Sequence, residues 1–306
     1  VERIFLVGED IGPYWEGAFA VSKGLAKEFG TERVRDTPIS ESCIIGVAVG
    51  AAMTGMKPIA EIMFGDLIAL AMDQIANQAA KIHYMFGGQL KVPMVMRTPF
   101  GAGRSIAAHH SQSLEAWLMH TPGLKVAVPS TAYDAKGLLK TAIRGEDPVM
   151  FCEHKICYTT KSSIPDEEYL IPFGEADIKR EGEDLTIFAT FYMVHQSLKA
   201  ADHLAKKGIE VEIIDPRTLV PLDKEKIIES VKKTGRLLIV EEDPLTCGVG
   251  AEIAAIVAEE AFDYLESPIK RIAEPDTPIP FSPILENYVI PNDRVIMKGV
   301  EDLLKS

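Results

Sequence analysis

The sequence of 306 residues contains little cysteine, few aromatic residues and no long apolar run. Its four cysteines form no Cys-X-X-Cys pair and no zinc-finger spacing; they are Cys43, Cys152, Cys157 and Cys247. Isolated thiols in a chain of this length are typical of reduced intracellular cysteines rather than of a disulfide framework. The sequence shows no charged and then apolar signal segment, so secretion is not expected.

Basic residues are also in deficit. Lys and Arg number 32 against 45 Asp and Glu, which gives a formal net charge of −13. Nucleic acids and anionic membranes need clustered basic side chains, so neither is expected as the main ligand. The longest apolar run, residues 44–53, is interrupted by Gly46 and Gly50 and is shorter than the ~20 residues of a membrane span. A hydrophobic content of 47% with 25% charged residues indicates an ordinary folded globular protein.

Several common nucleotide and hydrolase motifs are absent as well. The sequence has no Walker A loop, no Gly-X-Gly-X-X-Gly after a strand and no Gly-X-Ser-X-Gly elbow. The glycine-rich stretch at 101–104 opens no obvious helix and favours a plain turn. Gly248-Val249-Gly250 precedes a predicted helix, where it suits either phosphate binding or close packing of the helix on a strand, and packing is favoured.

Short β-branched runs alternate with helical patterns along the chain. In the first half the predicted strands are residues 4–7, 58–63, 93–97, 124–128 and 148–152. After the second of them, apolar residues recur at helical spacing from Leu67 to Ile82. This alternation predicts an α/β fold in which helices cover both faces of a parallel sheet. Ligands of such sheets bind at the carboxyl ends of the strands.

A change of character near the middle predicts two domains, as the length also suggests at roughly 150 residues per domain. The stretch from Lys155 to Asp184 is polar, carries Pro165 and Pro172 and lacks sustained periodicity. We predict a first domain over residues 1–160, a linker over 161–184 and a second α/β domain over 185–306. Its predicted strands are 185–189, 211–214 and 237–240, and its predicted helices lie around 194–205, 223–233 and 251–261.

Polar side chains fall at three places along the expected ligand edge. Glu9 and Asp10 end the first strand, where they suit a cation site or, by default, a solvated turn. Glu41 stands at the start of a predicted buried helix, and the helix dipole alone explains a carboxylate there. His109 and His110 lie in a polar loop between a strand and a helix, and metal binding is not expected because no set of carboxylates accompanies them. For His110, proton transfer and a purely structural role are equally open.

Five motifs follow one another in the first half: GEDIG at 8–12, DTPISE at 36–41, IGVAVG at 45–50, HSQS at 110–113 and PGLKV at 122–126. Together they resemble the β subunit of the thiamine-diphosphate-dependent decarboxylase component of 2-oxo acid dehydrogenase complexes. In the second half, DPRTLVPLD at 215–223 is similar to the transketolase C-terminal domain of the same family, and PFSP at 280–283 continues the match. The resemblance covers essentially the whole chain, and the joint occurrence of the motifs is far more specific than any one of them.

The resemblance implies a transketolase-like pyrimidine-binding domain followed by a transketolase C-terminal domain. The implied activity is oxidative decarboxylation of pyruvate or a branched-chain 2-oxo acid, with reductive acylation of the lipoyl group of an acyltransferase. Two alternatives stay open: the β subunit of acetoin dehydrogenase, and half of a split transketolase or deoxyxylulose-phosphate synthase. The sugar-phosphate enzymes need cationic side chains, and the loop 101–113 offers only Arg104.

The resemblance also implies roles for individual residues. Glu41 is expected to hydrogen-bond the pyrimidine ring nitrogen of thiamine diphosphate, and His110 to take part in proton transfer during lipoyl acylation. Glu9 corresponds to an acidic residue near the pyrimidine that supports communication between active sites. The residues expected to line the pyrimidine ring are Ile39, Met63 and Leu67. Leu67 stands where relatives generally carry an aromatic residue.

The same resemblance implies that the site is incomplete in this chain. Thiamine enzymes hold Mg²⁺ and diphosphate with a Gly-Asp-Gly motif, and none occurs here. The α subunit of an α₂β₂ heterotetramer is therefore expected to supply most of the Mg²⁺ ligands. No side chain of this sequence is assigned to a metal. Some relatives hold K⁺ through backbone carbonyls that correspond to Met94, Ala142 and Asp147.

The resemblance implies further partners and a compartment. Besides the α subunit and the 2-oxo acid or acetoin substrate, the expected partners are the lipoyl and subunit-binding domains of the acyltransferase. The expected compartment is the cytoplasm, or the mitochondrial matrix in a eukaryote. A leading helix found in relatives is expected before Val1.

Overall fold

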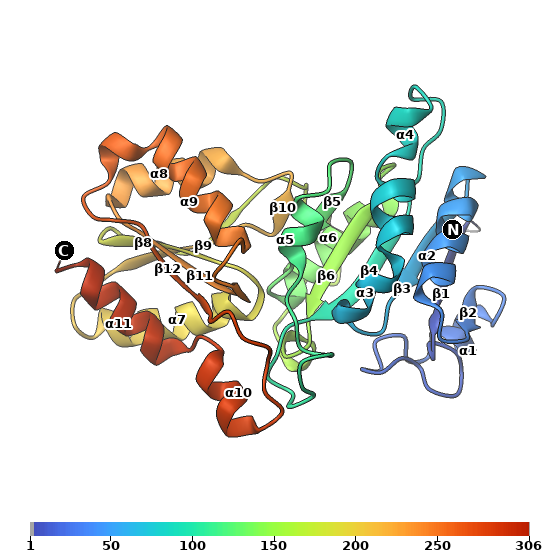
Figure 1. The fold of residues 1–306 in the computed structure, drawn as a ribbon, viewed down its shortest axis with the longest axis horizontal. Helices are drawn as coiled ribbons and strands as arrows, with labels where there is room; N and C mark the ends of the chain where they lie inside the picture. Colours follow the sequence, from blue (N-terminus) through green and yellow to red (C-terminus); the bar gives the residue numbers. More distant parts are fainter. Residues whose placement is uncertain (1–2, 306) are drawn as a thin grey trace.

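The computed structural model describes residues 3–305, so the outermost positions of the two predicted domains, 1–2 and 306, lie outside the described residues. Two sheets lie side by side along the long axis of the molecule (Figure 1). The first sheet has the order β10-β5-β6-β4-β3-β1-β2. Its strands are β1 (Ile4–Glu9), β2 (Val34–Thr37), β3 (Lys57–Glu61), β4 (Val95–Phe100), β5 (Lys125–Ala127), β6 (Val149–His154) and β10 (Thr218–Val220). All neighbours pair in parallel except β10, which is antiparallel to β5.

Helices surround this sheet, and the one predicted between Leu67 and Ile82 is not a single regular helix. That segment comprises η1 (Gly65–Leu67), α3 (Ile68–Met72), the π-helical η2 (Asp73–Ala79) and α4 (Ile82–Met85). The remaining helices of the first half are α1 (Leu25–Phe29), α2 (Glu41–Met53), α5 (Glu115–Met119), α6 (Ala132–Arg144) and η3 (Cys157–Thr159). Of the apolar positions at helical spacing, Ala71, Ile75, Ala79 and Ile82 are buried, whereas Leu70 is 61% exposed.

The second sheet has the order β12-β11-β8-β9-β7. Its strands are β7 (Asp177–Arg180), β8 (Leu185–Ala189), β9 (Val211–Asp215), β11 (Leu237–Pro244) and β12 (Lys270–Glu274). In Figure 1, α8 (Lys224–Thr234) and α9 (Val249–Glu260) cover one face, and α7 (Phe191–Ala205) and α11 (Asp293–Leu303) cover the other. The short η4 (Phe262–Tyr264) and α10 (Pro283–Val289) complete this half. The predicted α/β architecture with mostly parallel sheets is therefore confirmed.

The predicted linker differs from the structure in one respect. β7 lies inside residues 161–184 and pairs antiparallel with β9, so part of this segment belongs to the second sheet. All four residues of this strand, DIKR, are only half-buried. A strand in that position does not need an apolar run, so the sequence gives no strand signal there. Conversely β10, from the second half of the chain, joins the edge of the first sheet. The second half thus contributes one strand, β10, to the first sheet.

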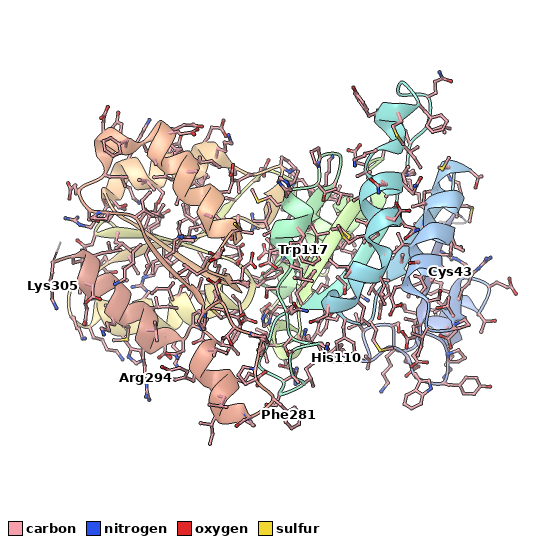
Figure 2. All side chains as sticks on the ribbon, in the orientation of Figure 1. Cys43, His110, Trp117, Phe281, Arg294 and Lys305 are labelled. Carbon is pink, nitrogen blue, oxygen red and sulfur yellow. The ribbon has the colours of Figure 1, made fainter. Side chains whose placement is uncertain are left out.

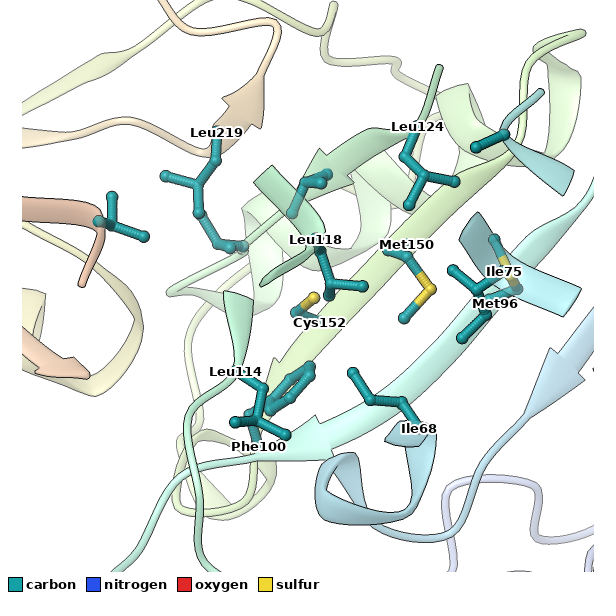
Figure 3. Packing of buried hydrophobic residues seen from close by; sticks show 14 of the residues in the cluster. Ile68, Ile75, Met96, Phe100, Leu114, Leu118, Leu124, Met150, Cys152 and Leu219 are labelled. Carbon is teal, nitrogen blue, oxygen red and sulfur yellow. The ribbon is translucent and has the colours of Figure 1, made fainter. Parts of the chain in front are cut away.

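A continuous core supports both halves. One cluster of buried apolar residues includes Phe100 and Met150 of the first sheet and Ile214 of the second. Figure 3 shows Leu219 of β10 beside the residues packed on β4 and β6. Gly65 lies against the Phe100 ring, where an added Cβ would collide, so the turn after β3 packs closely on β4. No helix among residues 3–305 combines the length and apolar character that crossing a membrane requires, and the four cysteines are free thiols.

Candidate functional site

The carboxyl ends of β1 and β2 bring two of the predicted residues together. Glu9 ends β1 and pairs in register with Thr37 of β2. The chain then turns into α2, whose first residue, Glu41, is only 5% exposed. Burial raises the pKa of the Glu9 carboxyl above its ordinary value, and the charges of Asp10, Glu41 and Asp36 raise it further. Glu9 and Glu41 therefore lie close enough to influence each other at the edge where ligands of such sheets bind.

The loop that follows Glu9 has an unusual backbone. Asp10, Glu16 and Ala20 adopt positive φ angles of 56°, 59° and 55°, a region that non-glycine residues rarely occupy. The turn is closed by hydrogen bonds, among them the Gly17 N–H to the Asp10 carbonyl at 2.8 Å. Backbone strain of this kind concentrates at functional sites. It falls here directly beside the predicted Glu9.

The three residues expected to line the pyrimidine ring differ in exposure. Ile39, in the connection between β2 and α2, is 75% exposed, whereas Met63 and Leu67 are half-buried. Met63 follows β3, and Leu67 ends η1 and packs against the main core. The hydroxyl of Ser42 donates to the Leu70 carbonyl, which links the start of α2 to the segment after Leu67. Two of the three predicted side chains are therefore partly shielded by the fold, and Ile39 is open to solvent.

His110 is joined to this edge by an aromatic contact that the sequence analysis missed. Its ring packs edge-to-face on Phe64, with the ring centroids 4.5 Å apart and an interplanar angle of 90°. Phe64 directly follows Met63, so the contact places His110 beside the predicted pyrimidine-lining segment. His110 is half-buried and His109 is exposed, so the two adjacent histidines differ in environment. Figure 2 shows His110 near the junction of the two halves.

A buried carboxylate holds the chain just after His110. Asp66 accepts hydrogen bonds from the backbone N–H of Gln112 at 3.1 Å and from its side-chain amide at 2.8 Å. Asp66 lies in η1, between Gly65 and the predicted Leu67. One short turn after β3 therefore supplies both a predicted cofactor contact and an anchor for the His110 loop. In the sequence, Asp66 is distinguished only as a charged residue inside an otherwise apolar segment.

A buried ion network supports the same edge of the sheet. Arg97 of β4 lies between Glu61 of β3, with which it is in direct contact, and Glu153 of β6 at 2.5 Å. Although burial disfavours its charge, the two carboxylates raise the pKa of Arg97 above its ordinary value. The Tyr158 hydroxyl also donates to Glu153, at 3.0 Å. The network links three adjacent strands, β3, β4 and β6. Removing one partner would leave a buried charge unpaired, which is strongly destabilising.

The backbone positions expected to hold K⁺ lie near the end of α6. Met94 and Ala142 are buried, and the Asp147 carboxylate forms an ion pair with Lys125 at 2.7 Å. The Lys57 ammonium donates to the three carbonyls of residues 143–145 at 2.8–3.1 Å. A fixed positive charge therefore already caps this helix end. Within residues 3–305, no three His, Cys, Asp or Glu side chains are grouped as a metal ion would require.

Comparison with known families follows the two halves of the chain. The transketolase pyrimidine-binding domain matches residues 1–161, and the transketolase C-terminal domain matches residues 174–296. A solved structure described as a split gene transketolase, inactive beta4 tetramer, superposes with a TM-score of 0.79 over 99% of this chain and 92% of that chain. At 24% identity this likeness concerns the fold. The protein is thus of the two-domain transketolase type.

Curated relatives are much closer in sequence. The acetoin:2,6-dichlorophenolindophenol oxidoreductase subunit beta of Bacillus subtilis is 48% identical, covering 99% of this chain and 92% of the relative. The 2-oxoisovalerate dehydrogenase subunit beta of the same organism is 47% identical, with coverages of 98% and 92%. The pyruvate dehydrogenase E1 component subunit beta of Rickettsia felis is also 47% identical, with coverages of 98% and 92%. The chain belongs to this family of dehydrogenase β subunits.

The transketolase-type domains imply thiamine diphosphate, and the residues present fit one part of it. A buried carboxylate at the start of α2, a second carboxylate beside it and half-buried apolar side chains suit an aminopyrimidine ring, which needs a hydrogen-bond partner at its edge and apolar contact on its faces. The diphosphate and its Mg²⁺ need a cluster of oxygen ligands. Among the described residues, no three Asp, Glu, His or Cys side chains are grouped in this way.

Proposed function

We propose that the chain is the β subunit of the decarboxylase component of a lipoate-linked 2-oxo acid dehydrogenase complex. Its substrate would be pyruvate or a branched-chain 2-oxo acid, and the acetoin dehydrogenase β subunit is the alternative within the same family. The observation that carries the proposal is the buried Glu41 at the start of α2, with Glu9 beside it. These carboxylates occupy the ligand edge of a transketolase-type pyrimidine domain.

The chain's own residues have binding and proton-holding roles. Glu41 holds the edge of the pyrimidine ring through a hydrogen bond to its nitrogen, and its burial keeps water from competing for that bond. Ile39, Met63 and Leu67 provide apolar contact to the ring. The electron sink for decarboxylation comes from thiamine diphosphate. Glu9, whose pKa is raised, is suited to share a proton near Glu41.

His110 is assigned to proton transfer during acylation of the lipoyl group. Imidazole titrates near neutral pH and can donate or accept a proton there. The edge-to-face contact with Phe64 fixes its ring plane, and the half-buried position leaves one side accessible to a substrate. The exposed His109 lacks such support and is not assigned a role.

The proposal includes partners that the chain needs. The α subunit would supply the Mg²⁺ and diphosphate side in an α₂β₂ heterotetramer. The lipoyl domain would be the acyl acceptor, and the net charge of −13 suits a basic subunit-binding domain of the acyltransferase. The same proposal includes K⁺ bound by backbone carbonyls near Met94, Ala142 and Asp147. It also includes a location in the cytoplasm or the mitochondrial matrix.

The sugar-phosphate alternatives are not favoured. Arg104, the cation in the loop 101–113, donates to the Lys155 carbonyl at 3.1 Å. This bond occupies one nitrogen of the guanidinium, and the Arg104 side chain is exposed. The relatives with 47–48% identity are dehydrogenase subunits, whereas the split transketolase structure shares 24%.

Copurification with an α subunit from the same source tests the proposal. We expect thiamine diphosphate with Mg²⁺ to bind the α and β chains together and not the β chain alone. The assembled enzyme should then be assayed with pyruvate, 2-oxoisovalerate and acetoin, using a lipoyl domain as acceptor. Turnover of one of these substrates with acylation of the lipoyl domain would support the proposal. Transfer to a sugar phosphate, or full activity of the β chain alone, would contradict it.

A further inference from the structure

The loop that carries His110 spans the junction between the two halves. It runs from the end of β4 to the start of α5, and the first half of the chain anchors it through Asp66 and Gln112. In Figure 1 the loop lies on the same side of the molecule as α10 of the second half, and Figure 2 places His110 and Phe281 on that side. The second half therefore lies within reach of this loop.

Glu286 of α10 contacts the loop from the second half of the chain. Its carboxylate is 2% exposed and accepts the Gly103 N–H at 2.8 Å. It also accepts the Ser105 N–H at 3.0 and 3.1 Å and the Ser105 hydroxyl at 2.9 Å. Hydrogen bonds to an ionised carboxylate are about twice as strong as those between neutral groups. One side chain thus fixes two loop residues that are 183 and 181 positions away in the sequence.

Glu242 of β11 adds a second buried contact one residue earlier in the loop. It accepts the Ala102 N–H at 2.5 Å and lies 3.1 Å from the Nε2 atom of His154 through both oxygens. Its burial acts to raise the pKa of this carboxyl, but His154, the Ala102 N–H and Lys155 outweigh it and leave the pKa below its ordinary value. Glu242 is therefore a carboxylate and an acceptor at neutral pH.

The backbone of the loop explains why it needs such anchors. Gly101 and Gly103 have φ angles of 86° and 90°, and Ser105 and Ala107 have φ angles of 54° and 66°. A non-glycine residue with positive φ persists when its surroundings hold it there. The anchors at 102–105 and at Gln112 lie on either side of His110. The loop conformation between them, and with it the position of the imidazole, depends on both.

We propose that Glu286 and Glu242 are positioning residues for His110, so that the second half of the chain sets the geometry of the acylation step. This inference rests on the proposed role of His110. Neither carboxylate is assigned contact with a substrate. They act through the backbone of residues 102–105, whose displacement would move His110 away from Phe64 and from an approaching lipoyl group.

The test uses the assembled α₂β₂ enzyme that carries the Glu286→Gln variant. It compares two activities of that enzyme: acylation of the lipoyl domain, and decarboxylation measured with an artificial electron acceptor. Glutamine keeps the size of the side chain but loses the charge and places an NH₂ group against N–H donors. We expect lipoyl-domain acylation to fall by about 10- to 100-fold, the range for losing hydrogen bonds to a charged group, while decarboxylation measured with an artificial electron acceptor falls much less. Equal losses in both assays would overturn the proposal, because a merely structural role lowers both together.

Two controls make the result decisive. Glu241→Gln removes an equally buried carboxyl one residue from Glu242, whose recorded partner is the Gly250 N–H at 2.6 Å rather than the loop, and it should leave the ratio of the two activities unchanged. His110→Ala must itself lose acylation selectively; if it does not, the proposed function of His110 fails rather than this inference. If Glu286→Gln does not assemble, Glu242→Gln decides, since it removes the charge of the second proposed anchor, which accepts the Ala102 N–H. A normal activity ratio in Glu242→Gln would then overturn the proposal.

Discussion

Glu41 and His110 lie at two ends of the site that are supported in different ways. Around Glu41 and Glu9 the chain is open: Tyr14, Trp15 and Ile39 are 90%, 72% and 75% exposed. Around His110 the chain supplies its own supports, with Phe64 beneath the ring and carboxylates from both halves holding the loop. The first end is the one that the proposed α subunit would complete. The second end is already organised within this chain.

The largest effect is expected at the open end, in the assembled enzyme. Replacing the carboxylate in Glu41→Ala should lower turnover by about 10²–10⁴-fold, the usual contribution of one acid–base group. Turnover of the reconstituted heterotetramer at saturating cofactor measures this. Glu28→Gln, an exposed glutamate of α1, is the control. Near-normal turnover of Glu41→Ala would remove the basis for assigning the pyrimidine contact to this residue.

At the self-supported end the expected effect is smaller and selective. His110→Ala should lower lipoyl acylation by about 10²-fold and affect decarboxylation with an artificial electron acceptor less. Single-turnover acylation of a lipoyl domain is the measurement. His109→Ala provides a matched control, because it removes an exposed histidine from the adjacent position. If His109→Ala and His110→Ala lower acylation equally, the assignment of proton transfer to His110 is wrong.

A third prediction concerns the buried carboxyl groups near the second end. Burial, followed by the charges of neighbouring carboxylates, raises the pKa of Glu274 to about 10, while burial raises that of Glu241 to about 8 and that of Asp243 to about 7. The folded protein therefore holds protons that the unfolded chain releases near its ordinary carboxyl pKa. Their stabilising contribution is complete below that value and is lost as pH rises through the folded pKa values.

The free energy of unfolding should thus decrease from about pH 5 to pH 8. Glu241→Gln imitates the protonated form and should reduce this slope by up to about 1.4 kcal/mol per pH unit. Denaturant unfolding of the isolated β chain at several pH values measures the slope. An unchanged slope in the variant would show that Glu241 is ionised in the folded chain.

The smallest effect on stability is expected for Ile39→Ala. Because the side chain is 75% exposed, the free energy of unfolding of the isolated chain should change by less than about 0.5 kcal/mol. In the assembled enzyme the same change should raise the thiamine diphosphate concentration needed for half-maximal activity. Denaturation curves and a cofactor titration test the two parts. A large loss of stability would mean that Ile39 supports the fold rather than the ligand.

The interior and the edges of the sheets differed in how well they could be predicted. The eight strands expected from apolar runs are all interior strands, for example β4, in which all six residues are buried. The strands that were missed in the described part of the chain, β2, β7, β10 and β12, form the edges of the two sheets. An edge strand pairs on one side and is partly exposed, so sequences such as VRDT and KRIAE carry no continuous apolar signal.

The site shows a similar division between local and distant information. Glu9, Glu41 and His110 lie in short motifs, so the sequence named them through resemblance. Their supports come from elsewhere, such as Phe64 for the His110 ring and Glu286 for the loop. An isolated glutamate near the end of the chain has no local feature that distinguishes it from the other acidic residues.

By itself, the sequence determined the α/β class, the interior strands and the family, because apolar periodicity and contiguous motifs are local properties. Only the tertiary structure decided which polar groups meet. Ser105 and Glu286 are 181 positions apart and hydrogen-bond at 2.9 Å because β10 crosses to the first sheet and the two halves share one core. Contacts of this kind depend on how the sheets are packed against each other, and that packing is set by the summed burial of many side chains rather than by any one segment.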